Sequence, residues 1–128
     1  MRPPRRTDSG AAVVDFVLVM IVLVPLVLAI MQIGLVLHVR NTLTTAASDG
    51  ARAAAVEGAM PADGARRARH MITEAVGHSY AQDVSARFTR SGGVPTVTVD
   101  VEAGVPALGL IGSVVRVHVS GRAIRQTS

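Results

Sequence analysis

One stretch decides the fold: "RRTDSGAAVVDFVLVMIVLVPLVLAIMQIGLVLHVR", which runs from Arg5 to Arg40. Between Phe16 and Leu37 it contains a single polar side chain, that of Gln32. As a helix, this segment would extend for roughly 33 Å at ~1.5 Å per residue, which matches the hydrocarbon core of a bilayer. The proline inside the segment does not exclude a helix, because transmembrane helices tolerate proline. The stretch therefore predicts a helix that spans a membrane.

Asp15 is an unexpected residue at the start of this apolar segment. An isolated carboxylate at mid-bilayer costs ~2.5–3.5 kcal/mol on insertion scales, and less near the interface. A cleaved signal peptide is one interpretation of the region, but its apolar core should be shorter, and the small residues Ala53–Ala55 lie far beyond the segment. A plain single-pass anchor is a second interpretation, and it leaves Asp15 unexplained. A headgroup position or a protonated carboxyl would also account for this acid.

A third interpretation follows from "SGAAVVDF", Ser9 to Phe16. A glycine is followed by a small residue, and an acid stands at the fifth position counted from Ala11. This pattern resembles the processing site of type IV pilin-like proteins. The resemblance implies that a prepilin peptidase cuts after Gly10, and that many members carry a methylated new N-terminus. The family usually has Glu where this chain has Asp15, a side chain one methylene shorter.

The leader and the segment "RNTLTTAASDGARAAAVEG" (Arg40 to Gly58) are similar to TadE-type pseudopilins of the tight-adherence (Flp) pilus system. TadG-type proteins share the N-terminal pattern but are usually longer. The resemblance implies a structural subunit whose partners are the membrane, the prepilin peptidase and other pilin subunits. It also implies that Asp15 and Phe16 serve subunit recruitment and register.

A physical argument supports the pairing of subunits through this acid. Cleavage after Gly10 would leave a free α-ammonium on Ala11. In an assembly, Asp15 of one subunit can face the ammonium of its neighbour, and in a low-dielectric setting such a pair selects partner and register. The three arginines of the leader favour a cytoplasmic N-terminus, although Arg40 lies just past the other end.

Composition excludes several classes of site. The chain has no cysteine, so it can form neither a disulfide nor a cysteine-based metal site. All 13 basic residues are arginine, the net charge is +4, and the aromatic residues are Phe 2 and Tyr 1, so stacking on nucleic acid is unsupported. His70 and Glu74, one helical turn apart, have no visible third ligand. The sequence predicts no catalytic, cofactor, metal or small-molecule site, and hence no enzyme.

Beyond the membrane, the first helix is expected to continue, with a ridge of small residues at Ala46, Gly50 and Ala54. Gly58 and Pro61 are expected to end it. Asp63 is expected to cap a second helix, whose apolar face is formed by Ala65, Ala68, Ile72, Ala75 and Val76. The small ridge would be covered by the chain's own domain, and the arginines of the second helix would face solvent.

The period then changes to two, which predicts three strands with one buried face each. Their apolar residues are Val84, Ala86 and Phe88; then Val97, Val99 and Val101; then Val115, Val117 and Val119. "RSGGVP" (Arg90 to Pro95) predicts a hairpin. The apolar loop "AGVPALGLIGS", with Val105, Leu108, Leu110 and Ile111, is expected either to fold over the core or to contact another subunit.

The sequence thus predicts an α+β fold: a long N-terminal transmembrane helix continuing outside the membrane, a second helix, and a small antiparallel sheet of about three strands. The expected parts are a leader (1–10), a transmembrane helix (11–38) and an extracytoplasmic domain (39–128). The expected function is that of a minor pilin or pseudopilin subunit in pilus assembly or a related secretion apparatus. The alternative is a single-pass membrane-anchored envelope protein with an extracytoplasmic binding domain.

Overall fold

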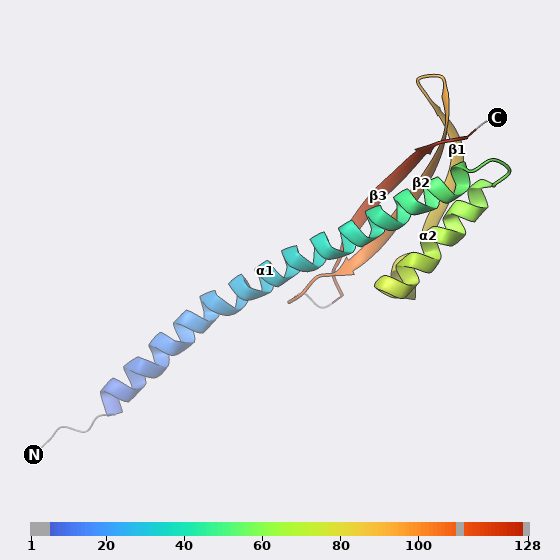
Figure 1. Ribbon diagram of the computed structural model, residues 1–128. Helices are drawn as coiled ribbons and strands as arrows, with labels where there is room; N and C mark the ends of the chain where they lie inside the picture. The colour runs from blue at the N-terminus through green and yellow to red at the C-terminus, as the bar shows by residue number, and fades with distance from the viewer. Residues whose placement is uncertain (1–5, 110–111, 127–128) are drawn as a thin grey trace, which may run out of the picture.

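A computed structural model describes residues 6–109 and 112–126 of the chain. One helix dominates it: α1, Arg6–Ala55, which continues through Pro25 without a break. The remaining elements are α2 (Pro61–Ala75), a short 3-10 turn η1 (His78–Ala81), and strands β1 (Asp83–Ser91), β2 (Val94–Pro106) and β3 (Val114–Ile124). Figure 1 shows that the N-terminal half of α1 projects away from all other elements. The C-terminal half of α1, α2 and the sheet form a compact head.

The sheet is a three-stranded antiparallel meander in the order β1-β2-β3. Its first turn is the two-residue segment Gly92–Gly93, with φ of 60° and 84°. Positive φ at both central residues defines the hairpin turn that glycine favours, which explains the glycine pair. Pro95 is the second residue of β2, at the strand start where proline is tolerated. The predicted hairpin is confirmed.

The head core lies between one face of the sheet and the helix pair α1–α2. Leu43 of α1 and Ile72 of α2 are fully buried, as are Val97, Val99 and Val101 of the central strand. The other members are mostly alanines and valines: Val39, Ala46, Ala47, Ala51, Ala65, Ala68, Ala81, Val84, Ala103, Val105, Val117 and Val119. A core of such small side chains requires the backbones to approach closely.

Three glycines make that approach possible. Gly50 of α1 faces Gly64 of α2, and a Cβ added to Gly50 would lie 2.5 Å from the carbonyl oxygen of Gly64. Gly121 of β3 lies against the α1 backbone at Ala47 and Ser48, where a Cβ would overlap main-chain atoms. The predicted small ridge is therefore covered by the chain's own α2 and β3. This confirms the expectation that the domain itself covers that ridge.

The turn between the helices differs from the expectation in one detail. Asp63 is not the capping residue of α2, which begins at Pro61 and is preceded by Met60. Instead, the Asp63 carboxylate accepts a hydrogen bond from the Met60 backbone N–H at 2.8 Å, from inside the first turn. Pro61 starts α2 because its missing N–H would be unpaired there anyway. At the end of α1, the Ala55 carbonyl accepts a hydrogen bond from the Gln126 N–H at 2.8 Å.

The strand predictions hold for the apolar residues Val97, Val99 and Val101 of the central strand. The opposite face of β2 was expected to be exposed, but Thr96 and Thr98 on it are buried.

Two apolar positions of the outer strands also differ from the prediction. Phe88 was expected on the buried face but is 43% exposed, because the β1–β2 hairpin extends past the helices, as Figure 1 shows. The guanidinium of Arg125 covers its ring instead, at 4.3 Å from the centroid. Val115 is likewise exposed rather than buried.

The segment that was expected to be an apolar loop is partly strand. β2 continues to Pro106, and Val105 is fully buried and pairs with Val115 of β3. The actual loop begins at Ala107 and lies along α1 rather than over the head core. Leu110 and Ile111 lie outside the described residues. These details leave the main prediction intact: the α+β fold with a long apolar helix, a second helix and a three-stranded antiparallel sheet is confirmed.

Candidate processing and assembly site

The four residues singled out by the sequence all lie near the start of α1. Gly10, Ala11, Asp15 and Phe16 are exposed, and the space around the Gly10 Cα is open, with no heavy atom within 4 Å of an added Cβ. Phe16 is 64% exposed. The structure therefore places the predicted cleavage point and the acid on one projecting helix, where another protein can reach them.

Helix geometry brings Ala11 and Asp15 onto the same face. Residues four apart in an α-helix are surface neighbours on successive turns. A helix that began at Ala11 would carry Asp15 close to its N-terminal end, where the unpaired N–H groups favour a negative charge. The position of the acid thus suits a helix whose first residue is Ala11.

Asp15 has no side-chain partner within the described part of its own chain. Among the described residues, no hydrogen bond or ion pair reaches its carboxylate. Beyond the leader, the first arginine is Arg40, which lies 25 residues further along α1, or about 37 Å at 1.5 Å per residue. If the leader is removed, its arginines leave with it. A cation for Asp15 must then come from the new N-terminus or from another molecule.

The helix around Asp15 presents apolar side chains on every side. Exposed residues include Val13, Val14, Phe16, Val17, Leu18, Val19, Ile21, Val22, Leu23 and Val24. α1 is long and apolar enough to cross a membrane, and its most apolar window contains no residue buried inside the protein. A soluble core helix would be largely covered, so this surface is suited to lipid or to other apolar helices.

The cleaved signal peptide fits this structure poorly. Val39, Leu43 and Ala47 of α1 are core residues of the head. Cleavage at Ala53–Ala55 would remove all three and leave the apolar face of the sheet uncovered. The same helix that can span the bilayer is therefore also needed to complete the head.

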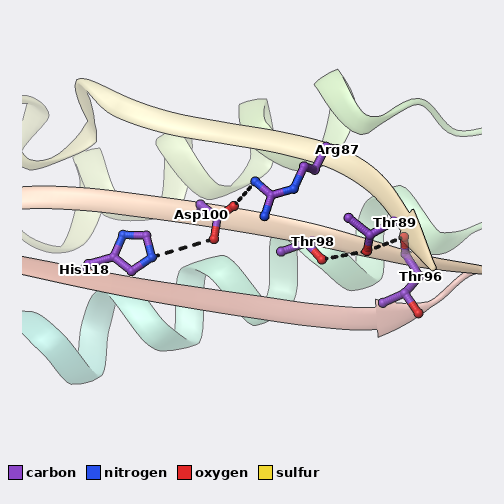
Figure 2. A network of polar contacts seen from close by, with 6 residues as sticks. All are labelled: Arg87, Thr89, Thr96, Thr98, Asp100 and His118. Carbon is purple, nitrogen blue, oxygen red and sulfur yellow. Dashed lines mark hydrogen bonds and ion pairs between the residues drawn. The ribbon is translucent and has the colours of Figure 1, made fainter. Parts of the chain in front are cut away.

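A second polar cluster, which the sequence did not reveal, lies on the outer face of the sheet (Figure 2). Asp100 on β2 accepts a hydrogen bond from Arg87 on β1 and lies 3.8 Å from the His118 Nε2 on β3. Next to it, the hydroxyls of Thr89 and Thr98 are 3.0 Å apart. These residues are the polar half of the alternation in each strand, which was the only sequence signal available.

The charges on this face are paired with one another. Glu102 accepts a hydrogen bond from Arg116 at 2.7 Å, and Asp100 is held by Arg87. The depression around them is also lined by Asp83, but no group of three or more side chains that could hold a metal ion occurs within residues 6–109 and 112–126. The charged residues named here therefore form ion pairs across the strands on the outer face.

Most charged residues of α2 have local contacts. His70 and Glu74 are 3.2 Å apart and exposed, and Arg66 pairs with Asp63 at 3.2 Å. Arg69 departs from the expected solvated role, because it donates a hydrogen bond to the Val84 carbonyl at 2.8 Å. This bond ties α2 to the edge strand β1.

Comparison with known proteins addresses the N-terminal part of the chain. Residues 10–52 match the family model described as TadE-like protein. This segment is TadE-like. No curated protein and no solved structure matches the chain. The TadE-like segment covers α1 from Gly10 to Arg52 and leaves α2 and the sheet outside the match.

The match confirms the resemblance seen in the sequence. A TadE-like segment and a single N-terminal apolar helix fit a membrane protein related to the Tad pilus. The apolar helix is suited to act as the membrane anchor. The match begins at Gly10, the residue after which the sequence pattern predicts cleavage.

Proposed function

We propose that this protein is a minor pilin or pseudopilin subunit that acts in assembly of a tight-adherence pilus or a related secretion apparatus. It inserts through α1 with its N-terminus in the cytoplasm and its head outside the cytoplasm. A prepilin peptidase removes residues 1–10, which leaves Ala11 as the first residue. The mature subunit then associates with other pilin subunits and the assembly machinery, and it can enter a surface filament.

The observation that carries this proposal is the isolation of Asp15. Its carboxylate lies on an apolar, exposed helix, with no partner among the described residues, and Arg40, the first arginine beyond the leader, is about 37 Å away along α1. A charge in such a place is costly unless another group neutralises it. The ammonium of Ala11 on a neighbouring subunit supplies that group, and a one-to-one pair would fix the axial position of each subunit.

The head is assigned a structural role and not an enzymatic one. Its polar outer face is internally paired, and its core is packed with alanine and valine side chains. No nucleic acid, cofactor or small-molecule substrate is required by the proposal. The head contributes a rigid outer body on the C-terminal half of α1 while the N-terminal half carries the contacts for assembly.

The test compares three substitutions of Asp15 at equal membrane levels in cells that contain the assembly system. Asp15→Ala and the nearly isosteric Asp15→Asn both remove the charge, and we expect each to reduce co-purification of pilus components at least tenfold. Asp15→Glu keeps the charge, so recovery of partners should stay within about twofold of the wild type. Cleavage after Gly10 should continue in all three, because the acid lies beyond the cut.

A matched control tests whether Asp15 acts by pairing with the Ala11 ammonium or by itself. Gly10→Leu should block the cut, so Asp15 remains but the Ala11 ammonium never forms, and partner recovery should fall as it does in Asp15→Ala. Equal recovery in wild type, Asp15→Ala and Gly10→Leu would refute the proposal. That result would favour a plain membrane anchor whose head binds an envelope component.

A further inference from the structure

The loop between β2 and β3 lies on the membrane side of the head, against the apolar part of α1 (Figure 1). The Leu108 backbone N–H donates a hydrogen bond to the Gln32 side-chain Oε1 at 2.6 Å. One turn further toward the N-terminus, Gly109 lies against Leu28, and a Cβ added to it would be 3.2 Å from Leu28 Cδ1. The base of the loop is closed by a hydrogen bond from the Ala107 N–H to the Ser113 carbonyl at 3.0 Å.

The contact between the loop and α1 lies within the part of α1 that is expected to cross the membrane. Ile33 and Leu37 are 61% and 54% exposed, and His38 is the first ionisable residue beyond them. If the hydrocarbon covers these two side chains, Gln32 and Leu28 lie about 8 and 14 Å inside its outer boundary at 1.5 Å per residue. If the hydrocarbon instead starts at Ala11, its ~30 Å thickness ends next to Gln32. In both placements the loop reaches the outer leaflet.

The chemistry of the loop suits that depth. From Ala103 to Val115 the sequence has no ionisable side chain, and Ser113 is the single polar one. Val114 is 59% exposed at the start of β3. Gly109 of this segment lies against Leu28, so the loop adjoins the exposed apolar surface of α1, which is suited to lipid.

The side chain of Gln32 provides a hydrogen-bond acceptor for the loop backbone at this depth in the membrane. A backbone N–H placed in hydrocarbon costs several kcal/mol unless it is hydrogen-bonded, and an isolated amide in the helix is costly for the same reason. The bond between Leu108 and Gln32 pairs the backbone N–H with the side-chain Oε1, whereas the Gln32 Nε2 is buried with no hydrogen-bond partner among the described residues. The bond to the Leu108 N–H explains why the single polar side chain between Phe16 and Leu37 lies at this position.

We propose that the loop at 107–109 and 112–114 dips into the outer leaflet beside α1 and is held there by Gln32. Its partner is the boundary between lipid headgroups and acyl chains. The head is then fixed against the membrane at two points, α1 and the loop. This inference goes beyond the proposed function and requires only that α1 crosses a bilayer, so it stands or falls independently of processing and pilus assembly.

The absence of cysteine makes a direct depth measurement possible, because each introduced cysteine is unique. The full chain with Leu108→Cys or Val114→Cys is labelled with bimane and reconstituted in phosphatidylcholine–phosphatidylglycerol vesicles. Ile33→Cys provides the lipid reference, and Ser91→Cys at the distant hairpin provides the water reference. With nitroxide on the acyl chains, we expect quenching at positions 108 and 114 of at least half the Ile33 value, against almost none at position 91.

A second variant tests the role of Gln32. Gln32→Met keeps the size of the side chain and removes the acceptor. Hydrogen exchange at the Leu108 amide in vesicles should accelerate at least tenfold in this variant, while exchange in β2 at Val99 should not change. The same acceleration is not expected for Gln82→Met, a matched change outside the contact.

Two results would overturn the proposal. Quenching of positions 108 and 114 by aqueous iodide at the level of position 91 would place the loop in water. Protection from both quenchers, with disulfide-linked dimers of Leu108→Cys that depend on the protein-to-lipid ratio, would show that a second copy covers the loop instead of lipid. Unchanged exchange at Leu108 in Gln32→Met would reject the role of the glutamine.

Discussion

The two halves of α1 share one continuous helical backbone but differ in the size and exposure of their side chains. Toward the N-terminus the exposed residues are large, with Ile21 and Val22 at 62% and 69% exposed. Toward the C-terminus the buried residues are mostly small, with Ala47 and Ala51 at 0%. Lipid is fluid and accommodates bulky side chains, whereas α2 and β3 are rigid and approach only where side chains are short.

This difference shows that side-chain size along a continuous helix indicates what the helix contacts. Leu43 and Val39, at the start of the packed half, are larger side chains and are also fully buried. Further along, β3 approaches α1 at Ala47 and Ser48, and α2 approaches it at Gly50, where a Cβ would lie 2.5 Å from the Gly64 carbonyl oxygen. A large residue placed in the packed C-terminal half of α1 should disrupt the head, whereas the same change in the exposed N-terminal half should not.

The largest effect is expected from Gly121→Leu. The new side chain would overlap the α1 backbone at Ala47 and Ser48, so β3 must leave the helix and the head loses one wall of its core. We expect loss of the folded head, an effect of about 5 kcal/mol or more, comparable to the stability of a small domain. Pulse proteolysis with trypsin in micelles should show cleavage at the head arginines without urea.

Gly34→Leu is the matched control in the other half of the helix. An added Cβ there meets no heavy atom within 4 Å, so the variant should resist trypsin like the wild type. If both variants keep the head folded, backbone contact between β3 and α1 is not what limits side-chain size in the packed half.

The next effect is expected from truncating large residues of α1. Leu43 is completely buried, and Leu43→Ala should destabilise the head by about 2–5 kcal/mol through lost burial and a residual cavity. Leu26 is 54% exposed in the apolar half, and Leu26→Ala should change head stability by less than about 0.5 kcal/mol. Urea midpoints from pulse proteolysis provide the measurement. Similar urea midpoints for both variants would contradict the claim that only the C-terminal half of α1 packs in the head core.

The smallest effect is expected from adding single methyl groups. Gly50→Ala places a Cβ 2.5 Å from the Gly64 carbonyl oxygen, so the helix pair must separate, and we expect a net loss of about 1–3 kcal/mol. This loss is expected despite the gain of up to ~1 kcal/mol in helix propensity. Gly34→Ala has that gain without the clash and should be neutral or slightly stabilising in the same urea titration. A stabilising Gly50→Ala would show that the two helices are not in close contact.

The sequence allowed most of the fold to be predicted because its signals are local. The apolar segment, the change of period to two at Val84, and the glycine pair at 92–93 each depend on neighbouring residues. The exposed Phe88 and the extension of β2 to Val105 were missed. These depend on where the helices end relative to the sheet, which periodicity within a strand does not reveal.

In the candidate site, too, contiguous motifs could be predicted from the sequence, whereas contacts between distant residues could not. Gly10 and Asp15 were found because the motif is contiguous, and their assignment to processing and assembly remains a prediction. The bond between Gln32 and Leu108 joins residues separated by 76 positions. In the sequence Gln32 appeared only as a polar exception, because its partner is a backbone N–H that any residue carries.

The most direct test of the account is the N-terminal residue of the mature protein. The chain is expressed with its prepilin peptidase, extracted from the membrane, and analysed by N-terminal sequencing and intact mass. We expect Ala11 as the first residue, free or methylated, and in Gly10→Leu we expect the full leader to remain. An unprocessed wild type that begins at Met1 or Arg2 while pilus assembly proceeds would contradict the central claim, because Asp15 would then have no ammonium at Ala11 to pair with.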